Sequence, residues 1–272
     1  MNTTIIFVCV VFVFVFLFCL YMAKSNYYYK YRNISAPWTL AYVINLKNTE
    51  EGKRRWSVFK NIPQFKNKVI RYPAIHGKTY DYKKEIANNI ITPTWNYGRW
   101  KYMNKDFHIN MEPGEIGVAL SHYNLWKKIS KMDEDSMVLI LEDDAIRIDP
   151  NLEKNVTYYL SKLPSDWDIF LLGFWLHKGD DGEQINKDVS KVNSFVLMNS
   201  YMIRPTGAKK LLEKLPINAP VDTWVALQSE YVNIYRHHMT YRNMFLKEKK
   251  NPRSILIRTR SHKSEIKHTN NW

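Results

Sequence analysis

The stretch from Met137 to Pro150 reads M-V-L-I-L-E-D-D-A-I-R-I-D-P. Its first five residues are wholly apolar and aliphatic, which is typical of a strand buried on both faces in a parallel sheet. The run stops at Glu142, Asp143 and Asp144. Three adjacent carboxylates at a buried strand end repel one another, so we expect a cationic group or ion opposite them. An acidic loop that water solvates is the alternative.

The position of these carboxylates indicates a site for a nucleotide and a divalent cation. An open α/β sheet places a nucleotide and its divalent cation at the carboxyl ends of its parallel strands, where hard oxygen ligands are suited to the cation. Strands that alternate with helices predict an α/β fold with a mostly parallel sheet flanked by helices. The other predicted strands are Thr39–Leu46, Lys68–Tyr72, Trp167–Gly173, Ser194–Ile203 and Tyr231–Tyr235.

The N-terminus predicts a membrane anchor. Every side chain from Ile5 to Met22 is apolar or aromatic, enough for a helix to cross about 30 Å of hydrocarbon. A cleaved signal peptide is the alternative, but it normally has a basic start, and Met1 to Thr4 carry no basic side chain. We therefore expect an anchor (1–23), a stalk (24–37), a globular domain (38–240) and a basic C-terminal tail (241–272), hence a single-pass membrane protein.

The side of the membrane on which the domain lies stays open. Lys24, Lys30 and Arg32 follow the apolar run, and the positive-inside rule then places the domain in the cytosol. Secretory-pathway enzymes with such anchors usually face the lumen of the endoplasmic reticulum or Golgi. Both cysteines, Cys9 and Cys19, lie inside the apolar run, which excludes a disulfide framework, a thiolate metal site and a cysteine nucleophile from the globular domain.

The chain is strongly basic, with a formal net charge of +14. Such a charge predicts attraction to nucleic acid, to an anionic membrane or to a phosphorylated substrate. The basic side chains are spread along the chain except in the C-terminal tail, which reads as a solvated or membrane-apposed segment. No DNA- or RNA-reading motif accompanies them, so nucleic acid is not an expected partner.

Four further residues are candidates for the site. Asn45, near the end of the first strand, either contacts a nucleotide or bonds to the loop that follows. Arg54 lies in an amphipathic segment whose basic residues are suited to neutralising phosphate. Asp222, just after Pro220, is either a helix N-cap or a general base or acceptor contact. His122 lies mid-helix, where a histidine is more often a core or supporting residue than a catalytic one.

The order of several motifs resembles that of a known family. They are Tyr42-Val43-Ile44-Asn45-Leu46, Ala74-Ile75-His76-Gly77, Pro113 to His122 with Leu125-Trp126, Leu139 to Ala145, Asp168 to Gly173, Ala208 to Leu212, and Pro220-Val221-Asp222. The family is glycosyltransferase family 25, the lipopolysaccharide-biosynthesis and procollagen galactosyltransferases. The resemblance covers about Leu40 to Tyr235, and its most specific part is the Gly-Glu-Ile-Gly…Ser-His helix that leads into Leu-Glu-Asp-Asp.

The resemblance implies a GT-A-like (Rossmann-like) fold, a UDP-sugar donor, and Mn²⁺ or Mg²⁺ held against the diphosphate by the acidic motif. It also implies inverting transfer of a hexose, usually galactose, to a hydroxyl of a glycan, protein or lipid acceptor. Carried onto this sequence, Asp143 and Asp144 hold the metal, Glu142 beside them belongs to the donor site, and Asn45 lies near the nucleotide. Arg54 is a further expected donor contact because of its charge. Asp222 serves the acceptor as the catalytic carboxylate.

The chain departs from the family pattern at two places. His76 stands where the family usually has Asp before the glycine, and Glu50 and Glu51 precede Lys53 and Arg54 where the family's turn is basic. Both departures bear on nucleotide contacts in the first loops more than on the metal site. The carboxylates themselves suit the chemistry, since a held cation neutralises a leaving diphosphate and a carboxylate base takes the acceptor proton.

Two rival classes fit parts of the pattern. A metal-dependent phosphoryl or nucleotidyl transferase also uses adjacent aspartates, but no glycine-rich phosphate loop is present. A non-catalytic, membrane-tethered basic protein that binds nucleic acid or anionic lipid is the other. The pattern as a whole favours a membrane-anchored, metal-dependent inverting glycosyltransferase. The sequence names neither its sugar, its acceptor nor its oligomeric state.

Overall fold

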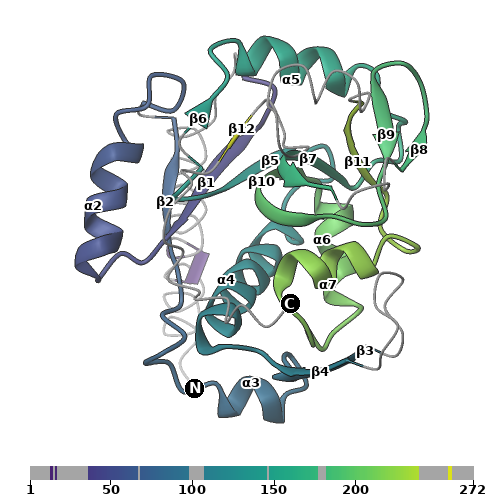
Figure 1. The fold of residues 1–272 in the computed structure, drawn as a ribbon. Coiled ribbons are helices and arrows are strands. Elements are labelled where there is room, and N and C mark those ends of the chain that lie inside the picture. Colours follow the sequence, from purple (N-terminus) through teal and green to yellow (C-terminus); the bar gives the residue numbers. More distant parts are fainter. Residues whose placement is uncertain are drawn as a thin grey trace, which may run out of the picture.

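The computed structural model describes residues 36–66, 68–97, 107–145, 147–176 and 182–238, together with 13, 14, 16, 257 and 258. Its centre is an eight-stranded sheet in the order β2-β1-β5-β10-β7-β11-β9-β8 (Figure 1). The strands are β1 (Leu40–Asn45), β2 (Ile70–Pro73), β5 (Val138–Glu142), β7 (Ile169–Trp175), β8 (Glu183–Gln184), β9 (Val189–Lys191), β10 (Val196–Ile203) and β11 (Ile234–His237).

Six helices of the described residues surround this sheet. They are α2 (Glu50–Phe59), α3 (Lys83–Ala87), α4 (Pro113–Ile129), α5 (Leu152–Leu160), α6 (Pro205–Leu212) and α7 (Val221–Leu227). Two small ribbons are separate from the main sheet: β3 (Thr94–Tyr97) pairs with β4 (Phe107–Asn110), and β6 (Arg147–Ile148) pairs with β12 (Ile257–Arg258).

The sheet is mixed, so the expectation of a mostly parallel sheet was wrong. Parallel pairs join β1 to β2, β1 to β5 and β7 to β11. Strand β10 runs antiparallel to both of its neighbours, β5 and β7, and β9 runs antiparallel to β11 and β8. The sequence correctly predicted a strand at β10, but strand character alone does not specify the direction in which a strand runs.

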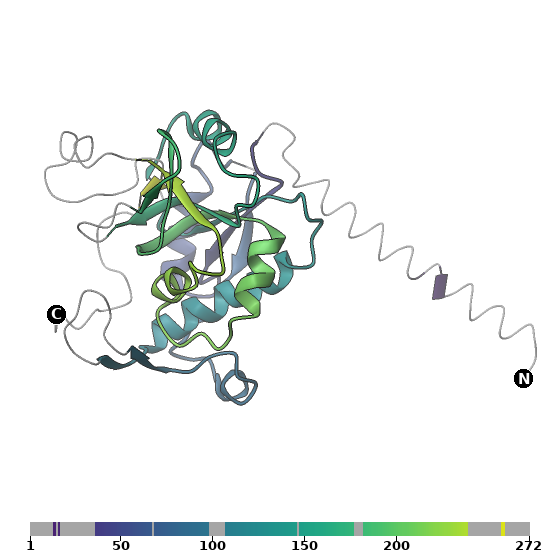
Figure 2. The same cartoon turned by 90° about the vertical axis from the view of Figure 1, so that its right-hand side faces the viewer.

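Helices cover both faces of the sheet (Figure 2). Alternate residues of β1 point to opposite faces. Leu40, Tyr42 and Ile44 pack with α4, α6 and α7, whereas Ala41 and Val43 pack with α2 and α5. Two apolar layers therefore enclose the middle of the strands.

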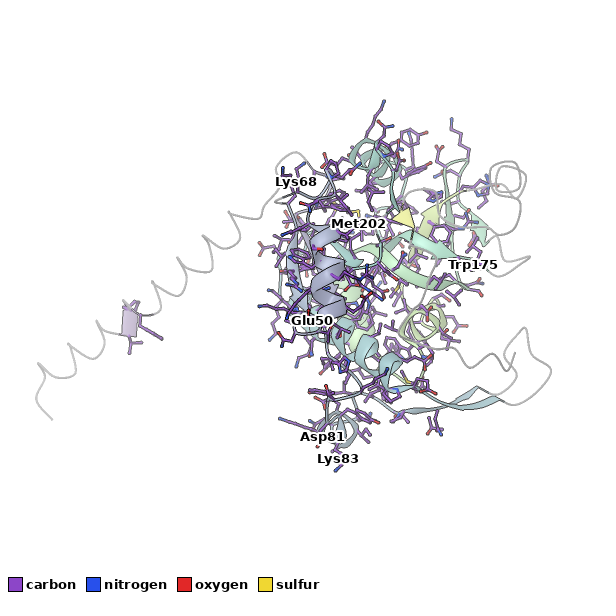
Figure 3. All side chains as sticks on the ribbon, turned by 60° about the vertical axis from the view of Figure 1, so that its left-hand side comes forward. Glu50, Lys68, Asp81, Lys83, Trp175 and Met202 are labelled. Carbon is purple, nitrogen blue, oxygen red and sulfur yellow. The ribbon has the colours of Figure 1, made fainter. Side chains whose placement is uncertain are left out.

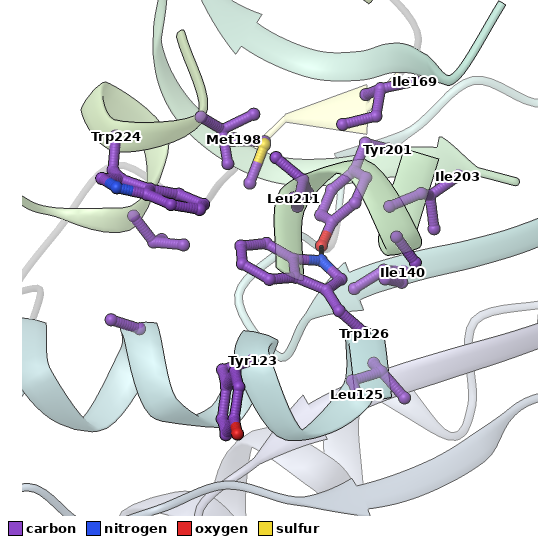
Figure 4. Packing of buried hydrophobic residues seen from close by; sticks show 14 of the residues in the cluster. Tyr123, Leu125, Trp126, Ile140, Ile169, Met198, Tyr201, Ile203, Leu211 and Trp224 are labelled. Carbon is purple, nitrogen blue, oxygen red and sulfur yellow. Dashed lines mark hydrogen bonds between the residues drawn. The ribbon is translucent and has the colours of Figure 1, made fainter. Parts of the chain in front are cut away.

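Helix α4 begins with strong local signals. Pro113 occupies its first turn, and Glu112 and Glu115 form a capping box, with the Glu112 backbone N–H donating to Glu115 Oε2 at 2.8 Å. Trp126, in its last turns, packs fully buried against Tyr201 and stacks on Trp224 (Figure 4). The helix is thus fixed at both ends.

The described residues contain no helix that is long and apolar enough to cross a membrane. This finding corrects the expectations of an N-terminal transmembrane helix and of a single-pass membrane location, since no spanning helix is found among the described residues. Of the apolar run only Val13, Phe14 and Phe16 are described, and the rest of it, the stalk before Ala36 and most of the basic tail lie outside the described residues.

The loop after β2 lies directly against α4. A Cβ on Gly77 would be 1.6 Å from the Pro113 carbonyl oxygen, and a Cβ on Gly117 would be 2.6 Å from the Ile75 carbonyl oxygen. The Ile75 N–H also donates to Ser121 Oγ at 2.8 Å. Only glycine permits this backbone-to-backbone approach.

We expect Gly117→Ala to destabilise the fold by about 1–3 kcal/mol, because the atoms in its way are backbone and cannot rotate aside. This clash outweighs the gain of up to about 1 kcal/mol that alanine brings to a helix interior. Urea unfolding measures the change. Asn124→Ala, at an exposed position of the same helix, is the control and should stay within about 0.5 kcal/mol of the wild type. A stabilised Gly117→Ala would contradict the close approach.

Candidate functional site

A pocket of about 140 Å³ lies at the carboxyl ends of β1 and β5. Asn45 enters it from β1, and Glu142, Asp143 and Asp144 enter it from the end of β5. The first turns of α2, the loop after β2 and the first half of α4 form the other walls. The structure therefore brings together four of the residues that the sequence indicated.

Asp143 is the carboxylate that the protein itself neutralises. Arg55 Nη1 donates to Asp143 Oδ1 at 3.0 Å, and Asn45 Nδ2 donates to Asp143 Oδ2. Asn45 is in turn held by Arg71, whose Nε donates to Asn45 Oδ1 at 2.8 Å. Burial raises the pKa of Asp143, and the hydrogen bond and charge of Arg55 oppose that rise. Both oxygens of this carboxylate are engaged by the protein.

Glu142 and Asp144 pair with no lysine or arginine in the part of the chain that the structure describes. Glu142 Oε1 lies 3.5 Å from His122 Nε2, and Asp144 Oδ1 is buried without a hydrogen-bond partner. Burial first, and neighbouring carboxylates second, raise the pKa of Glu142 to about 8 and that of Asp144 to about 7. Both groups therefore favour a state in which a proton or a cation offsets their charge.

This pair has the chemistry of a divalent-cation site, although the protein alone does not complete one. The described part of the chain holds no group of three or more His, Cys, Asp or Glu side chains arranged to bind a metal ion. Mg²⁺ commonly takes only one or two protein carboxylates and fills its other positions with phosphate oxygens and water. The unpartnered oxygen of Asp144 beside Glu142 fits such a cation.

Arg54 does not line the pocket, whereas Arg55 does. Arg54 Nε and Nη2 each donate to Glu51 at 2.6 Å, and its side chain is 58% exposed. Figure 3 marks the start of this helix with Glu50. Gly52 and Phe59 are its buried positions, and their spacing places residues 55 and 56 on the inner face. Neither Arg55 nor Arg71 was predicted as a site residue from the sequence; the helical period was the signal that could have found Arg55.

Asp222 lies outside the pocket lining. Its Oδ2 accepts the Leu197 N–H at 2.8 Å and its Oδ1 accepts the Thr223 N–H at 2.7 Å. Pro220 occupies the N-cap position of α7, so Asp222 lies in the first turn and not at the cap. Its charge is nevertheless close enough to contribute to the raised pKa of Glu142.

His122 is fully buried behind Glu142. Burial lowers the pKa of His122 to about 4, so its imidazole is neutral near pH 7. Its Nδ1 lies 2.8 Å from the Tyr201 hydroxyl, which also accepts a hydrogen bond of 2.8 Å from Trp126 Nε1. The expectation of a supporting residue agrees with this placement.

The part of the chain that contains the pocket is similar to known proteins. Residues 39–225 match the model of a family described as "Glycosyltransferase family 25 (LPS biosynthesis protein)". A "Glycosyltransferase 25 family member" of Aedes aegypti is 30% identical over 194 residues, which are 68% of this chain and 30% of the relative. "Procollagen galactosyltransferase 1-A" of Xenopus laevis is 28% identical over 217 residues, 75% of this chain and 33% of the relative. The chain spans about a third of the length of these curated relatives.

One solved structure also shares a distant similarity. The chain described as "Crystal Structure of A197 from STIV" is 14% identical, with a TM-score of 0.35, and the match covers 85% of this chain and 98% of that one.

The raised pKa of Glu142 predicts how the stability of the metal-free protein depends on pH. In the folded state its pKa is about 8, against 4.5 for an ordinary glutamate. The folded state therefore binds more protons than the unfolded state between these values, and stability falls as pH rises through the folded pKa. We expect the free energy of unfolding to drop by about 1 kcal/mol between about pH 7 and pH 8.5.

Urea unfolding in the presence of a chelator measures this drop. Glu142→Gln removes the titrating group and should flatten most of the profile, with Asp144 accounting for the remainder. A wild-type profile that is already flat over this range would contradict a Glu142 carboxyl that stays protonated in the folded state near pH 7.

Proposed function

This chain belongs to glycosyltransferase family 25, and we propose that it transfers a sugar from a nucleotide-sugar donor to a hydroxyl group of an acceptor. One observation carries the proposal: Asn45 and the three carboxylates of Glu142–Asp144 line one pocket inside the matched segment 39–225. Open α/β sheets bind nucleotides at the carboxyl ends of their strands. The name of the Xenopus relative supports galactose as the sugar, and UDP-galactose is our proposed donor.

The pocket also offers a positive charge for the donor's diphosphate. Arg55 already forms ion pairs with Asp143 and Glu51. Lys78 lines the same pocket and has no ion pair within the described ranges. An ammonium in this position attracts a phosphate oxygen as a point charge. We assign the diphosphate to the side of the pocket that Lys78 and the loop after β2 form.

Mn²⁺ or Mg²⁺ is our proposed cofactor, held by Asp144 with Glu142. The sequence had assigned the metal to Asp143 and Asp144, but the Arg55 and Asn45 contacts of Asp143 favour Glu142 as the second ligand. When bound, the cation neutralises the negative charge that develops on the leaving diphosphate. Asp143 then contributes by fixing the end of β5 to α2.

Asp222 is our proposed acceptor of the hydroxyl proton. In an inverting transfer the acceptor oxygen forms a bond to the sugar's anomeric carbon while the bond to the diphosphate breaks, and the hydroxyl proton passes to a carboxylate. The two backbone N–H groups that Asp222 accepts fix its orientation. Oδ1 also accepts the Thr223 hydroxyl at 3.5 Å, whereas Oδ2 keeps a further lone pair for the proton.

Asp144→Asn is expected to lower sugar transfer by about 100-fold or more, because it removes the charge that offsets the cation. The assay combines the full chain, UDP-galactose or UDP-glucose, and Mn²⁺ or a chelator, and measures released UDP. Asp135→Asn, at an exposed site outside the pocket, is the matched control and should retain wild-type turnover. Full metal-dependent transfer by Asp144→Asn would overturn the metal assignment.

Asp222→Asn tests the proposed base. The amide oxygen can still accept one backbone N–H, so the fold should be largely retained, while the loss of a proton acceptor should reduce kcat by about 10²–10⁴-fold. The KM for the donor should change little, because Asp222 does not line the pocket. Steady-state kinetics on the variant measure both values, and a wild-type kcat would exclude Asp222 as the base.

A further inference from the structure

Helix α4 and strand β10 bring three aromatic side chains into hydrogen-bond contact behind Glu142. Trp126 Nε1 donates to the Tyr201 hydroxyl at 2.8 Å, and that hydroxyl lies 2.8 Å from His122 Nδ1. The three side chains are no more than 1% exposed. Figure 4 shows the ring nitrogen of Trp126 directed at the oxygen of Tyr201.

The donors and acceptors of this chain run in one direction. An indole N–H only donates, so the Tyr201 oxygen accepts from Trp126. We assign the single proton of the Tyr201 hydroxyl to the bond with His122 Nδ1, because this nitrogen is the hydroxyl's other hydrogen-bond neighbour among the described residues. A neutral imidazole carries one proton, and Nδ1 is the acceptor, so that proton lies on His122 Nε2.

The N–H at His122 Nε2 faces the pocket's carboxylate. This nitrogen is buried and makes no hydrogen bond within the usual limits, and Glu142 Oε1 lies 3.5 Å from it. A buried donor without a partner is costly. A short movement of the Glu142 carboxylate would bring Oε1 within hydrogen-bond distance of the His122 Nε2–H. That bond would also fix the orientation of the carboxylate beside Asp144.

We propose that His122 is a positioning residue that orients the Glu142 carboxylate as a cation ligand, with Tyr201 and Trp126 holding its ring and its tautomer. The inference rests on the proposed function, in which Glu142 and Asp144 hold a divalent cation. Groups that hydrogen-bond metal ligands from behind commonly change metal affinity by about 10–100-fold. His122 acts through Glu142 and does not itself touch the donor.

Binding of Mn²⁺ alone to the full chain, measured by titration calorimetry, tests the proposal without relying on activity. His122→Asn keeps a polar group near the Nδ1 position, facing Tyr201, but loses the donor toward Glu142. His122→Gln keeps an N–H near the Nε2 position. We expect His122→Asn to weaken Mn²⁺ binding by about 10-fold or more, and His122→Gln to restore most of the affinity.

Two further variants separate positioning from general damage. Tyr201→Phe removes the hydroxyl that directs the imidazole and should weaken Mn²⁺ binding while leaving the ring in the core. His237→Asn alters another fully buried histidine that does not line the pocket, and it should leave Mn²⁺ affinity unchanged. If the His122 variants do not fold, an unchanged affinity in Tyr201→Phe overturns the proposal.

The possible failures are distinguishable. Equal Mn²⁺ affinity in wild type and His122→Asn, or equal losses in His122→Asn and His122→Gln, overturns the positioning role while sugar transfer stands. An active wild type that binds no Mn²⁺ overturns it as well and leaves the transferase proposal intact. A wild type that binds Mn²⁺ with the expected pattern of variants but turns over no UDP-sugar supports the positioning role and contradicts the proposed function.

Discussion

The ion pair between Arg55 and Asp143 is the contact on which the site depends. It joins α2 to the end of β5 across the carboxyl end of β1, where Asn45 bonds to the same carboxylate. Removing one partner of such a buried pair leaves an uncompensated charge, which costs far more than the pair itself contributes. Because Arg71 holds Asn45 from β2, the contact also fixes the first strands of the sheet to one another.

Adjacent residues of the acidic triplet have different environments, and this gives them different tasks. Asp143 has an arginine partner, whereas Glu142 faces a neutral, buried imidazole and Asp144 has an oxygen with no hydrogen bond. Pairs of acids whose surroundings shift their pKa values apart commonly divide structural and chemical roles. Here the paired carboxylate secures the strand end, and the unpaired carboxylates are left to respond to a ligand.

The sequence predicted which residues meet at one edge of the sheet better than it predicted their contacts. Asn45 and Glu142–Asp144 could be placed at one sheet edge because parallel strands end on the same side, and β1 and β5 are indeed parallel neighbours. The sequence prediction chose Arg54, but Arg55 is the arginine that lines the pocket. Composition does not distinguish the two, because adjacent residues of a helix point in directions about 100° apart, so one can be exposed while the next faces inward. The direction of β10 was also missed, since strand character does not specify whether a strand runs parallel or antiparallel to its neighbours. The apolar run at the N-terminus did not establish a spanning helix among the described residues.

Helix α4 connects the pocket wall to the support behind the carboxylates. Ser121 accepts the Ile75 N–H and so holds the loop after β2, while the next residue, His122, turns toward Glu142. One further turn along, Trp126 reaches the hydroxyl that orients His122. A displacement of α4 therefore moves both the pocket wall formed by the loop after β2 and the His122 side chain behind Glu142. The capping box, the backbone contact at Gly117 and the buried Trp126 all oppose such a displacement. This shared dependence gives a physical reason why a Gly-Glu-Ile-Gly…Ser-His…Trp pattern precedes Leu-Glu-Asp-Asp in one continuous segment: the helix sets the geometry in which the carboxylates of the following strand are presented.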